Sequence, residues 1–166
     1  MIKGWHQDKD ITTINDYKHK PNKRGPQYVR KMLASMKGEI NSNTIIVGDF
    51  NTPLTPMDWS TKQKISKETQ TLNNTMDQLD LIDIYMMFCP KTMNFTFYSR
   101  AHGTFSRIDH ILSNKSSLGK LRKIEIISSI FYDHNVVRLD VNYRGKKSTN
   151  IWRLNNRLLN NQQITE

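Results

Sequence analysis

The stretch TIIVGDFN, residues 44–51, joins a short apolar run to an acid and an amide. Ile45, Ile46 and Val47 are typical of a strand buried on both faces. Because side chains on a strand alternate between its two faces, we expect Asp49 and Asn51 to point the same way, opposite Phe50. Such groups at a strand end commonly face a ligand crevice. A turn capped by Asp49 and Asn51 is the alternative.

A helix is expected directly before this strand. It begins near Pro26, and apolar residues recur at three-to-four-residue spacing through Ile40. They are Val29, Met32, Leu33, Met36 and Ile40. A helix that leads into a buried strand predicts an α/β layered fold.

Further elements follow along the chain. A second helix is expected over residues 68–79, and residues 81–88 (LIDIYMMF) either continue it or form a short strand. Alternating apolar residues predict four more strands, with a hairpin loop at RAHG, residues 100–103. The strand segments are NFTFYS (94–99), TFSRIDHIL (104–112), KIEIIS (123–128) and DHNVVRLDVNY (133–143). Residues 11–14 are a candidate for one short strand near the beginning of the chain.

The length of 166 residues suits one domain with a modest core, since only 36% of the residues are hydrophobic. We expect that domain to span residues 1–143. Residues 144–166 are expected to form a basic linker and the start of a following helical region. Cys89 is the only cysteine, which excludes an internal disulfide. With neither a membrane span nor a signal peptide in the sequence, an intracellular protein is expected, nuclear if it acts on DNA.

The net charge of +10, from 25 Lys and Arg against 15 Asp and Glu, favours a polyanionic partner. Each phosphate that a basic protein neutralises releases condensed counterions, which drives binding to nucleic acid. A merely soluble basic surface would have the same composition, so charge alone does not establish this partner.

Three polar clusters stand at the ends of expected strands: Asp49 with Asn51, Asp109 with His110, and Asp133 with His134. Neighbouring side chains on an extended chain diverge, so Asp133 is not expected to orient His134. Asp109, from another strand, is the expected partner of the imidazole. Carboxylates and an amide without cysteine suit a hard cation such as Mg²⁺ and suit phosphodiester hydrolysis.

At this point the sequence resembles a known family. Three segments carry the similarity: IIVGDFNTPL (45–54), GTFSRIDHIL (103–112) and DHNVVRLDVNY (133–143). They are similar to the apurinic/apyrimidinic-endonuclease-like domain of the LINE-type (L-one) non-LTR retrotransposon polyprotein of mammals. That domain belongs to the endonuclease/exonuclease/phosphatase superfamily. The resemblance implies a deoxyribonuclease-I-like α/β sandwich as the fold. It also implies an enzyme that nicks duplex DNA at T-rich sites, where the nick primes reverse transcription.

The resemblance also implies roles for individual residues. Asp49 would transfer protons near the nucleophile or leaving group, and Asn51 and Tyr17 would lie at the scissile phosphate. His134, held by Asp109, would act as general base or polarise the phosphate. Asp133 would be an accessory carboxylate near Mg²⁺. The residues implied to contact DNA, at or near the hairpin, are Thr96, Arg100, Ser106 and Arg107.

The chain also departs from the family pattern. The family's domain begins with strands that carry a metal-binding glutamate, and we expect this chain, which starts at MIKGW (residues 1–5), to lack them. We therefore expect an N-terminally truncated sandwich with weak or lost Mg²⁺ binding, inactive as a nuclease alone. We do not expect the reverse transcriptase domain of the parent polyprotein in this chain. A basic nucleic-acid-binding fragment without catalysis is the alternative function, and a chain too truncated to fold stably is a third possibility.

Overall fold

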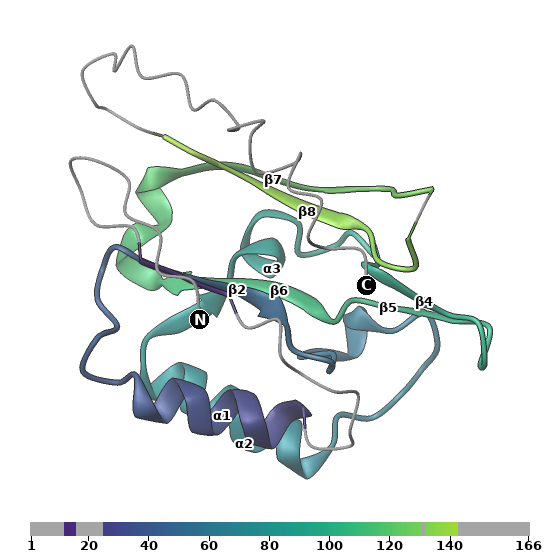
Figure 1. Cartoon of the computed structure of the whole chain (residues 1–166), viewed down its shortest axis with the longest axis horizontal. Coiled ribbons are helices and arrows are strands. Elements are labelled where there is room, and N and C mark those ends of the chain that lie inside the picture. Colours follow the sequence, from purple (N-terminus) through teal and green to yellow (C-terminus); the bar gives the residue numbers. More distant parts are fainter. Residues whose placement is uncertain (1–11, 16–24, 131, 143–166) are drawn as a thin grey trace, which may run out of the picture.

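The structure, a computed structural model, describes residues 12–15, 25–130 and 132–142 (Figure 1). Its helices are α1 (Gly25–Ser35), η1 (Pro56–Asp58), α2 (Lys67–Gln78), α3 (Ile84–Phe88) and η2 (Lys115–Lys120). Its strands are β1 (Thr12–Asn15), β2 (Thr44–Asp49), β3 (Leu81–Asp83), β4 (Phe97–Ser99), β5 (Thr104–Ser106), β6 (Asp109–Asn114), β7 (Leu121–Ile127) and β8 (Val136–Val141). The expected domain boundary near residue 144 lies outside the described residues.

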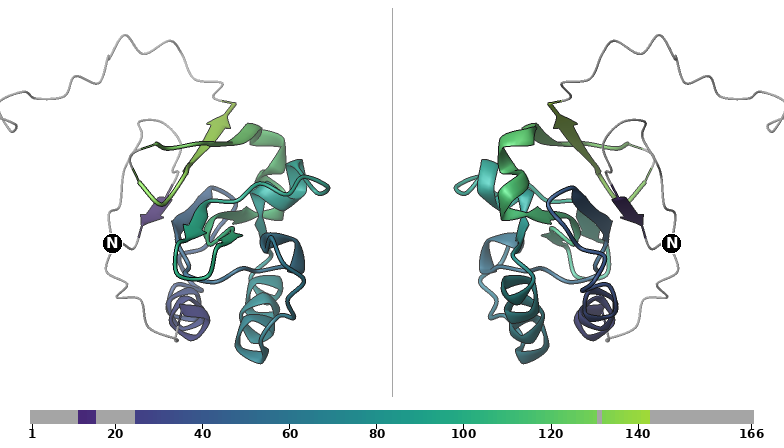
Figure 2. Two further views of the ribbon diagram at one scale, coloured as in Figure 1. Left: turned by 90° about the vertical axis from the view of Figure 1, so that its right-hand side faces the viewer. Right: turned by 90° about the vertical axis from the view of Figure 1, so that its left-hand side faces the viewer.

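The described elements form three layers. A central sheet has the strand order β1-β2-β6-β3, in which β1 runs parallel to β2 and the other pairs are antiparallel. Helices α1 and α2 lie side by side beneath one face of this sheet, and the β7–β8 ribbon lies above the other face (Figures 1 and 2). This arrangement confirms the predicted α/β class.

Strand β2 explains why the sequence needs an unbroken apolar run. Ile46 packs with Leu33, Leu72 and other residues of the core beneath the sheet. Ile45, on the opposite face, packs with Ile84 in the core beneath the β7–β8 ribbon. Since both faces of β2 are covered, apolar side chains suit both of them. Thr44 is also buried, and its hydroxyl oxygen accepts a hydrogen bond from the Asn41 N–H.

The helices follow the predicted pattern with small changes at their ends. Helix α1 buries Val29 and Leu33 as expected, but it ends at Ser35 and the chain continues to Ile40 in hydrogen-bonded turns. Helix α2 covers nearly the predicted range, because Ser66 caps its first turn by accepting a hydrogen bond from the Thr69 backbone N–H.

Two predicted segments divide in ways that periodicity does not reveal. Residues 81–88 form a strand and then a helix, because the Asp83 carboxylate accepts a hydrogen bond from the Tyr85 N–H and caps α3. The expected strand 104–112 splits into β5 and β6. At the break, the Arg107 N–H donates to the Asp58 carbonyl rather than to a neighbouring strand.

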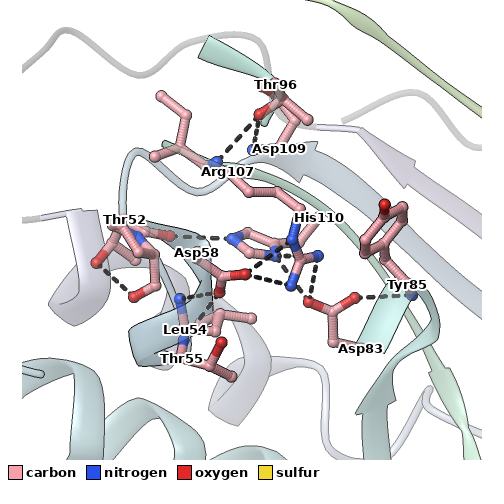
Figure 3. Close-up of polar contacts among 12 residues, drawn as sticks. Thr52, Leu54, Thr55, Asp58, Asp83, Tyr85, Thr96, Arg107, Asp109 and His110 are labelled. Carbon is pink, nitrogen blue, oxygen red and sulfur yellow. Dashed lines mark hydrogen bonds and ion pairs between the residues drawn. The ribbon is translucent and has the colours of Figure 1, made fainter. Parts of the chain in front are cut away.

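Arg107 is the largest fully buried side chain among the described residues, and it joins three parts of the fold (Figure 3). Its Nε donates to Asp58 Oδ1 at 2.8 Å, and its Nη1 donates to Asp83 Oδ2 at 2.7 Å. His110 Nδ1 lies 2.9 Å from that same Asp83 oxygen. We call these four residues the Arg107 cluster.

The Arg107 cluster also anchors the loop after β2. The second oxygen of Asp58 accepts hydrogen bonds from the backbone N–H groups of Leu54 and Thr55. Asp58 therefore links the loop that contains η1 to Arg107, which lies just before the start of β6. The loop after β2 and the start of β6 are therefore held together by the buried charges of Asp58 and Arg107.

Charge pairing decides the ionisation of Asp83. Burial raises the pKa of its carboxyl. The hydrogen bond and charge of His110 and the charge of Arg107 lower this pKa by more than burial raises it, so the net pKa lies below the ordinary value. A folded-state pKa below that of the unfolded chain means that this pairing stabilises the fold above the unfolded pKa. The contribution is lost as the pH falls through the folded value.

We predict that Arg107→Met, which keeps most of the side-chain volume, lowers the free energy of unfolding by about 3–5 kcal/mol, because it leaves two buried carboxylates without their cation. Urea unfolding followed by circular dichroism measures this change. Arg122→Met removes an exposed arginine on β7 and should change stability by no more than about 0.5 kcal/mol. Equal effects of the two substitutions would contradict a structural role for the Arg107 cluster.

Candidate active site

The ends of β2 and β6 bring two carboxylates together. Asp49 and Asp109 are register partners in the antiparallel pair β2–β6. Directly opposed residues in such a pair project to the same face of the sheet. The sequence motifs at residues 49 and 109 are therefore neighbours in space, although they lie far apart in the chain.

His134 reaches these carboxylates from the segment before β8. Its Nδ1 lies 2.9 Å from Asp109 Oδ2, which confirms the prediction that Asp109 rather than Asp133 orients the imidazole. The ring also packs against Phe97, with 4.9 Å between the ring centroids. With Nδ1 held by a carboxylate, Nε2 is the nitrogen that remains for a ligand.

Asp49, Asp109 and His134 form one group, in which one candidate ligand atom from each residue lies within 4.8 Å of the others. They border a cavity of about 610 Å³. Apolar side chains line much of the cavity wall, among them Val47, Ile111 and Val137. The arrangement places two carboxylates and an imidazole at the edge of a partly apolar pocket.

The environment shifts the pKa values of two of these groups upward. The hydrogen bond that His134 donates to the Asp109 carboxylate raises the pKa of His134 above its ordinary 6.5, with help from the charges of Asp49 and Asp133, although burial opposes the shift. Burial raises the pKa of Asp49, and the nearby charge of Asp109 adds to it, against the hydrogen bond from the Asn51 N–H. At neutral pH, His134 therefore carries more positive charge than an isolated histidine, and Asp49 is a better proton acceptor than an isolated aspartate.

Asn51 does not continue the strand, so the expectation based on alternating faces is wrong here. Strand β2 ends at Asp49, and Asn51 adopts a left-handed backbone conformation with φ of 50°. Its N–H donates to Asp49 Oδ1 at 2.7 Å. The stretch thus ends in a turn capped by Asp49, the alternative that the sequence allowed, and the Asn51 side chain is exposed.

Asp133 lies at the rim of the cavity with an exposed side chain. It is outside the group of three possible ligands, and its backbone carbonyl accepts a hydrogen bond from the Tyr98 N–H. Its predicted role as a metal ligand stays a prediction. Tyr17 lies outside the described residues.

Of the four residues expected to contact DNA, Arg100 alone is exposed, in the turn between β4 and β5. The side chains of Thr96, Ser106 and Arg107 are 0%, 6% and 2% exposed. The expectation that these three touch DNA is corrected, because their burial leaves no surface for a ligand. Arg107 belongs instead to the buried cluster described above.

Thr96 and Asn135 support the site, and sequence analysis missed this role. Thr96 Oγ1 accepts hydrogen bonds from the backbone N–H groups of Ile108 and Asp109 (Figure 3). The Asn135 N–H donates to the Thr96 carbonyl at 2.7 Å. Thr96 therefore connects the chain at Asp109 to the chain next to His134. Asn135 had one sequence signal, its position directly after His134.

Comparison with protein families gives a match over residues 8–131 to the model of the Endonuclease/Exonuclease/phosphatase family. The chain belongs to this family. It is also 28% identical over 145 residues to the "Transposon TX1 uncharacterized 149 kDa protein" of Xenopus laevis, a match that covers 83% of this chain and 11% of that protein. The chain thus corresponds to a small part of this much longer relative.

Solved structures show the same fold. An AP endonuclease from Archaeoglobus fulgidus matches with a TM-score of 0.62 at 16% identity, over 79% of this chain and 62% of that one. The endonuclease domain of TRAS1, a telomere-specific non-LTR retrotransposon, matches with a TM-score of 0.64 at 16% identity, over 85% and 62%. The predicted deoxyribonuclease-I-like α/β fold is confirmed, and the chain spans about three-fifths of these structures.

A third match is a variant of the 3′ phosphatase NExo from Neisseria, described as bound to product DNA hairpin. Its TM-score is 0.64 at 16% identity, and the match covers 80% of this chain and 62% of that one. As for membranes, no helix among the described residues is long and apolar enough to cross one.

The raised pKa of His134 gives a direct test of the site. We predict that ¹H NMR titration of the folded chain gives His134 a pKa above 6.5, and that Asp109→Asn lowers it, because the amide removes the negative charge at Nδ1. Since protonated His134 binds Asp109 more strongly, the pair stabilises the fold fully below pH 6.5 and loses this effect as the pH rises through the folded pKa.

The matched control for this titration is Asp77→Asn, which removes an exposed carboxylate from α2 and should leave the His134 pKa unchanged. An equal change in the two variants, or a wild-type pKa at or below the ordinary value, would rule out the pairing of His134 with Asp109 in solution.

Proposed function

We propose that this chain carries a hydrolytic centre that cleaves a phosphodiester bond of duplex DNA. The observation that carries this proposal is the His134–Asp109 pair beside Asp49, at one cavity on the edge of the sheet. Membership of the endonuclease/exonuclease/phosphatase family and the net charge of +10 support it. A DNA complex of the structurally similar NExo supports the choice of substrate.

In the proposed reaction, His134 and Asp49 have complementary roles. Asp109 holds the imidazole by Nδ1, so the protonated ring presents Nε2–H to a non-bridging phosphate oxygen and offsets the charge of the pentacoordinate phosphate. Asp49, whose pKa is raised, accepts a proton from the attacking water. The water oxygen forms the new P–O bond as the P–O bond to one sugar oxygen breaks, and that leaving oxygen takes up a proton from solvent. No covalent intermediate with the chain is formed.

We propose Mg²⁺ as the cofactor of this centre. The donor set fits, because Mg²⁺ is usually held by one or two carboxylates and by substrate phosphates, and the carboxylates of Asp49 and Asp109 share one group. Asp133, at the rim, would be the accessory carboxylate. The ion would neutralise charge on the phosphate during hydrolysis.

The resemblance to the transposon TX1 protein and to the TRAS1 endonuclease domain supports an origin in a non-LTR retrotransposon. We propose that the chain derives from the LINE-type element of mammals, in which a nick at a T-rich site in the nucleus primes reverse transcription. The sequence leads us to expect a chain that is inactive as a nuclease alone. Because Asp49, Asp109 and His134 still form one group, we propose slow hydrolysis instead, limited by the two carboxylates that the described residues bring to that group.

The alternative function is nucleic-acid binding without catalysis. The net charge of +10 and the exposed aromatic residues Tyr98 and Phe105 beside Arg100 favour it. The two functions share salt-dependent binding to DNA, so binding does not separate them. A dependence on His134 does.

We predict that the chain nicks supercoiled plasmid DNA slowly in the presence of Mg²⁺, and that His134→Ala lowers the rate by about 10²-fold or more, as expected for the loss of a group that acts in the transition state. Gel electrophoresis of the plasmid measures the rate. Asp77→Ala, on the exposed face of α2, is the control and should keep the wild-type rate. If the wild-type chain binds the plasmid but nicks it no faster than the His134→Ala variant does, the alternative function, binding without catalysis, would be established.

A further inference from the structure

His110 is a buried histidine that the proposed reaction does not use. It follows Asp109 on β6, so its side chain projects to the opposite face of the sheet. It is 1% exposed, and its ring lies 5.3 Å from the ring of Phe50. The same strand end therefore directs Asp109 to the cavity and His110 to the turn that follows β2.

Both ring nitrogens of His110 are fixed. Nε2 lies 3.0 Å from the carbonyl oxygen of Thr52, and because a carbonyl accepts, Nε2–H is the donor (Figure 3). Nδ1 lies 2.9 Å from Asp83 Oδ2, an oxygen that Arg107 also binds. The Arg107 cluster thus holds the ring in place, and the ring holds the backbone at Thr52.

The backbone at Thr52 connects directly to the carboxylate of Asp49. Asn51 precedes Thr52, and the Asn51 N–H donates to Asp49 Oδ1 at 2.7 Å. The Asn51 side chain is exposed, so side-chain packing does not fix this residue. Its φ of 50° lies in the left-handed region, which asparagine adopts more readily than most non-glycine residues, so contacts of the backbone on either side decide how firmly this conformation is held.

A second contact confines the turn from the side of α1. A Cβ atom added to Gly25 would lie 2.8 Å from the carbonyl oxygen of Phe50 and 3.2 Å from that of Asn51. The turn is therefore held between the first residue of α1 and the ring of His110. Displacement of either neighbour would free the Asn51 N–H to move.

We propose that His110 is a positioning residue for the active-site carboxylate of Asp49. His110 donates to the Thr52 carbonyl, and this contact fixes the position of the neighbouring Asn51 N–H. The Asn51 N–H in turn holds Oδ1 of Asp49, so Oδ2 is the oxygen available to the cavity. The effect of His110 reaches the site from the opposite face of the sheet. The proposal goes beyond the proposed function, which rests on the three residues at the cavity.

The experiment compares amide hydrogen exchange in the wild-type chain and in two folded variants by NMR. His110→Phe keeps an aromatic ring but removes the donor, and exchange at the Asn51 N–H should increase about fivefold, the factor expected for loss of one hydrogen bond. His110→Gln keeps an N–H donor for the Thr52 carbonyl and should restore exchange close to the wild-type rate. Equal exchange in the wild-type and His110→Phe chains would overturn the proposal, as would equal acceleration in the two variants.

Ser113→Ala is the matched control, because Ser113 is also fully buried on β6 but its hydroxyl donates to the Asn114 carbonyl and not to the turn after β2. It should leave exchange at Asn51 unchanged, and a general loosening of the fold would accelerate exchange in this variant too. A coupling test follows from Asp49→Ala, which removes the acceptor. In that background His110→Phe should cause no further acceleration at Asn51, whereas additive effects would contradict the connection to Asp49.

The wild-type chain provides a readout that needs no variant. The Nε2–H of His110 should give a slowly exchanging NMR signal with a nuclear Overhauser contact to the Thr52–Pro53 segment, and a rapidly exchanging signal would overturn the proposal. In the plasmid assay, His110→Phe should lower kcat, the rate at saturating DNA, by a larger factor than the factor by which it raises KM. This last measurement alone rests on the proposed function, so exchange at Asn51 tests the positioning role even in a chain that does not cleave DNA.

Discussion

The ion pairs of Arg107 with Asp58 and Asp83 are the constraint on which the rest of the structure depends. A buried guanidinium costs free energy to desolvate, and paired carboxylates with good hydrogen bonds offset that cost. Each carboxylate belongs to a different part of the chain, one in η1 and one at the end of β3. Arg107 can be satisfied only if both parts assemble around the start of β6, and the catalytic candidate Asp109 begins that strand.

The site is therefore built from strand ends that buried polar contacts hold in place. The β2–β6 register sets Asp49 against Asp109, and Thr96 ties the start of β6 to the segment that carries His134. Thr96 is fully buried and is not among the residues that line the cavity. Because the groups at the cavity are partly exposed, their geometry comes from the rigid backbone beneath them, as precise functional sites require.

Sequence reasoning predicted those parts of the site that follow from strand geometry. Adjacent side chains diverge on a strand, which was enough to reject Asp133 and choose Asp109 as the partner of His134. It failed where a local contact overrides periodicity: the Asp49 cap on the Asn51 N–H turns the chain out of the strand. Arg107 was misassigned because a basic residue beside a hairpin has the same sequence pattern whether it faces DNA or two buried carboxylates. Its partners Asp58 and Asp83 lie 49 and 24 residues away in the sequence, so local pattern could not reveal them.

Binding of Mn²⁺ in place of Mg²⁺ tests most directly whether Asp49, Asp109 and His134 form a single site. The paramagnetic ion broadens NMR signals close to it, so a titration of the ¹⁵N-labelled chain maps where it binds. A single site predicts that the amide signals at residues 49, 109 and 134 broaden together at the lowest Mn²⁺ concentration, and that Asp49→Asn weakens the broadening at residue 134. Broadening that affects residues 49 and 134 at separate concentrations, or that begins elsewhere on the surface, would contradict a shared centre.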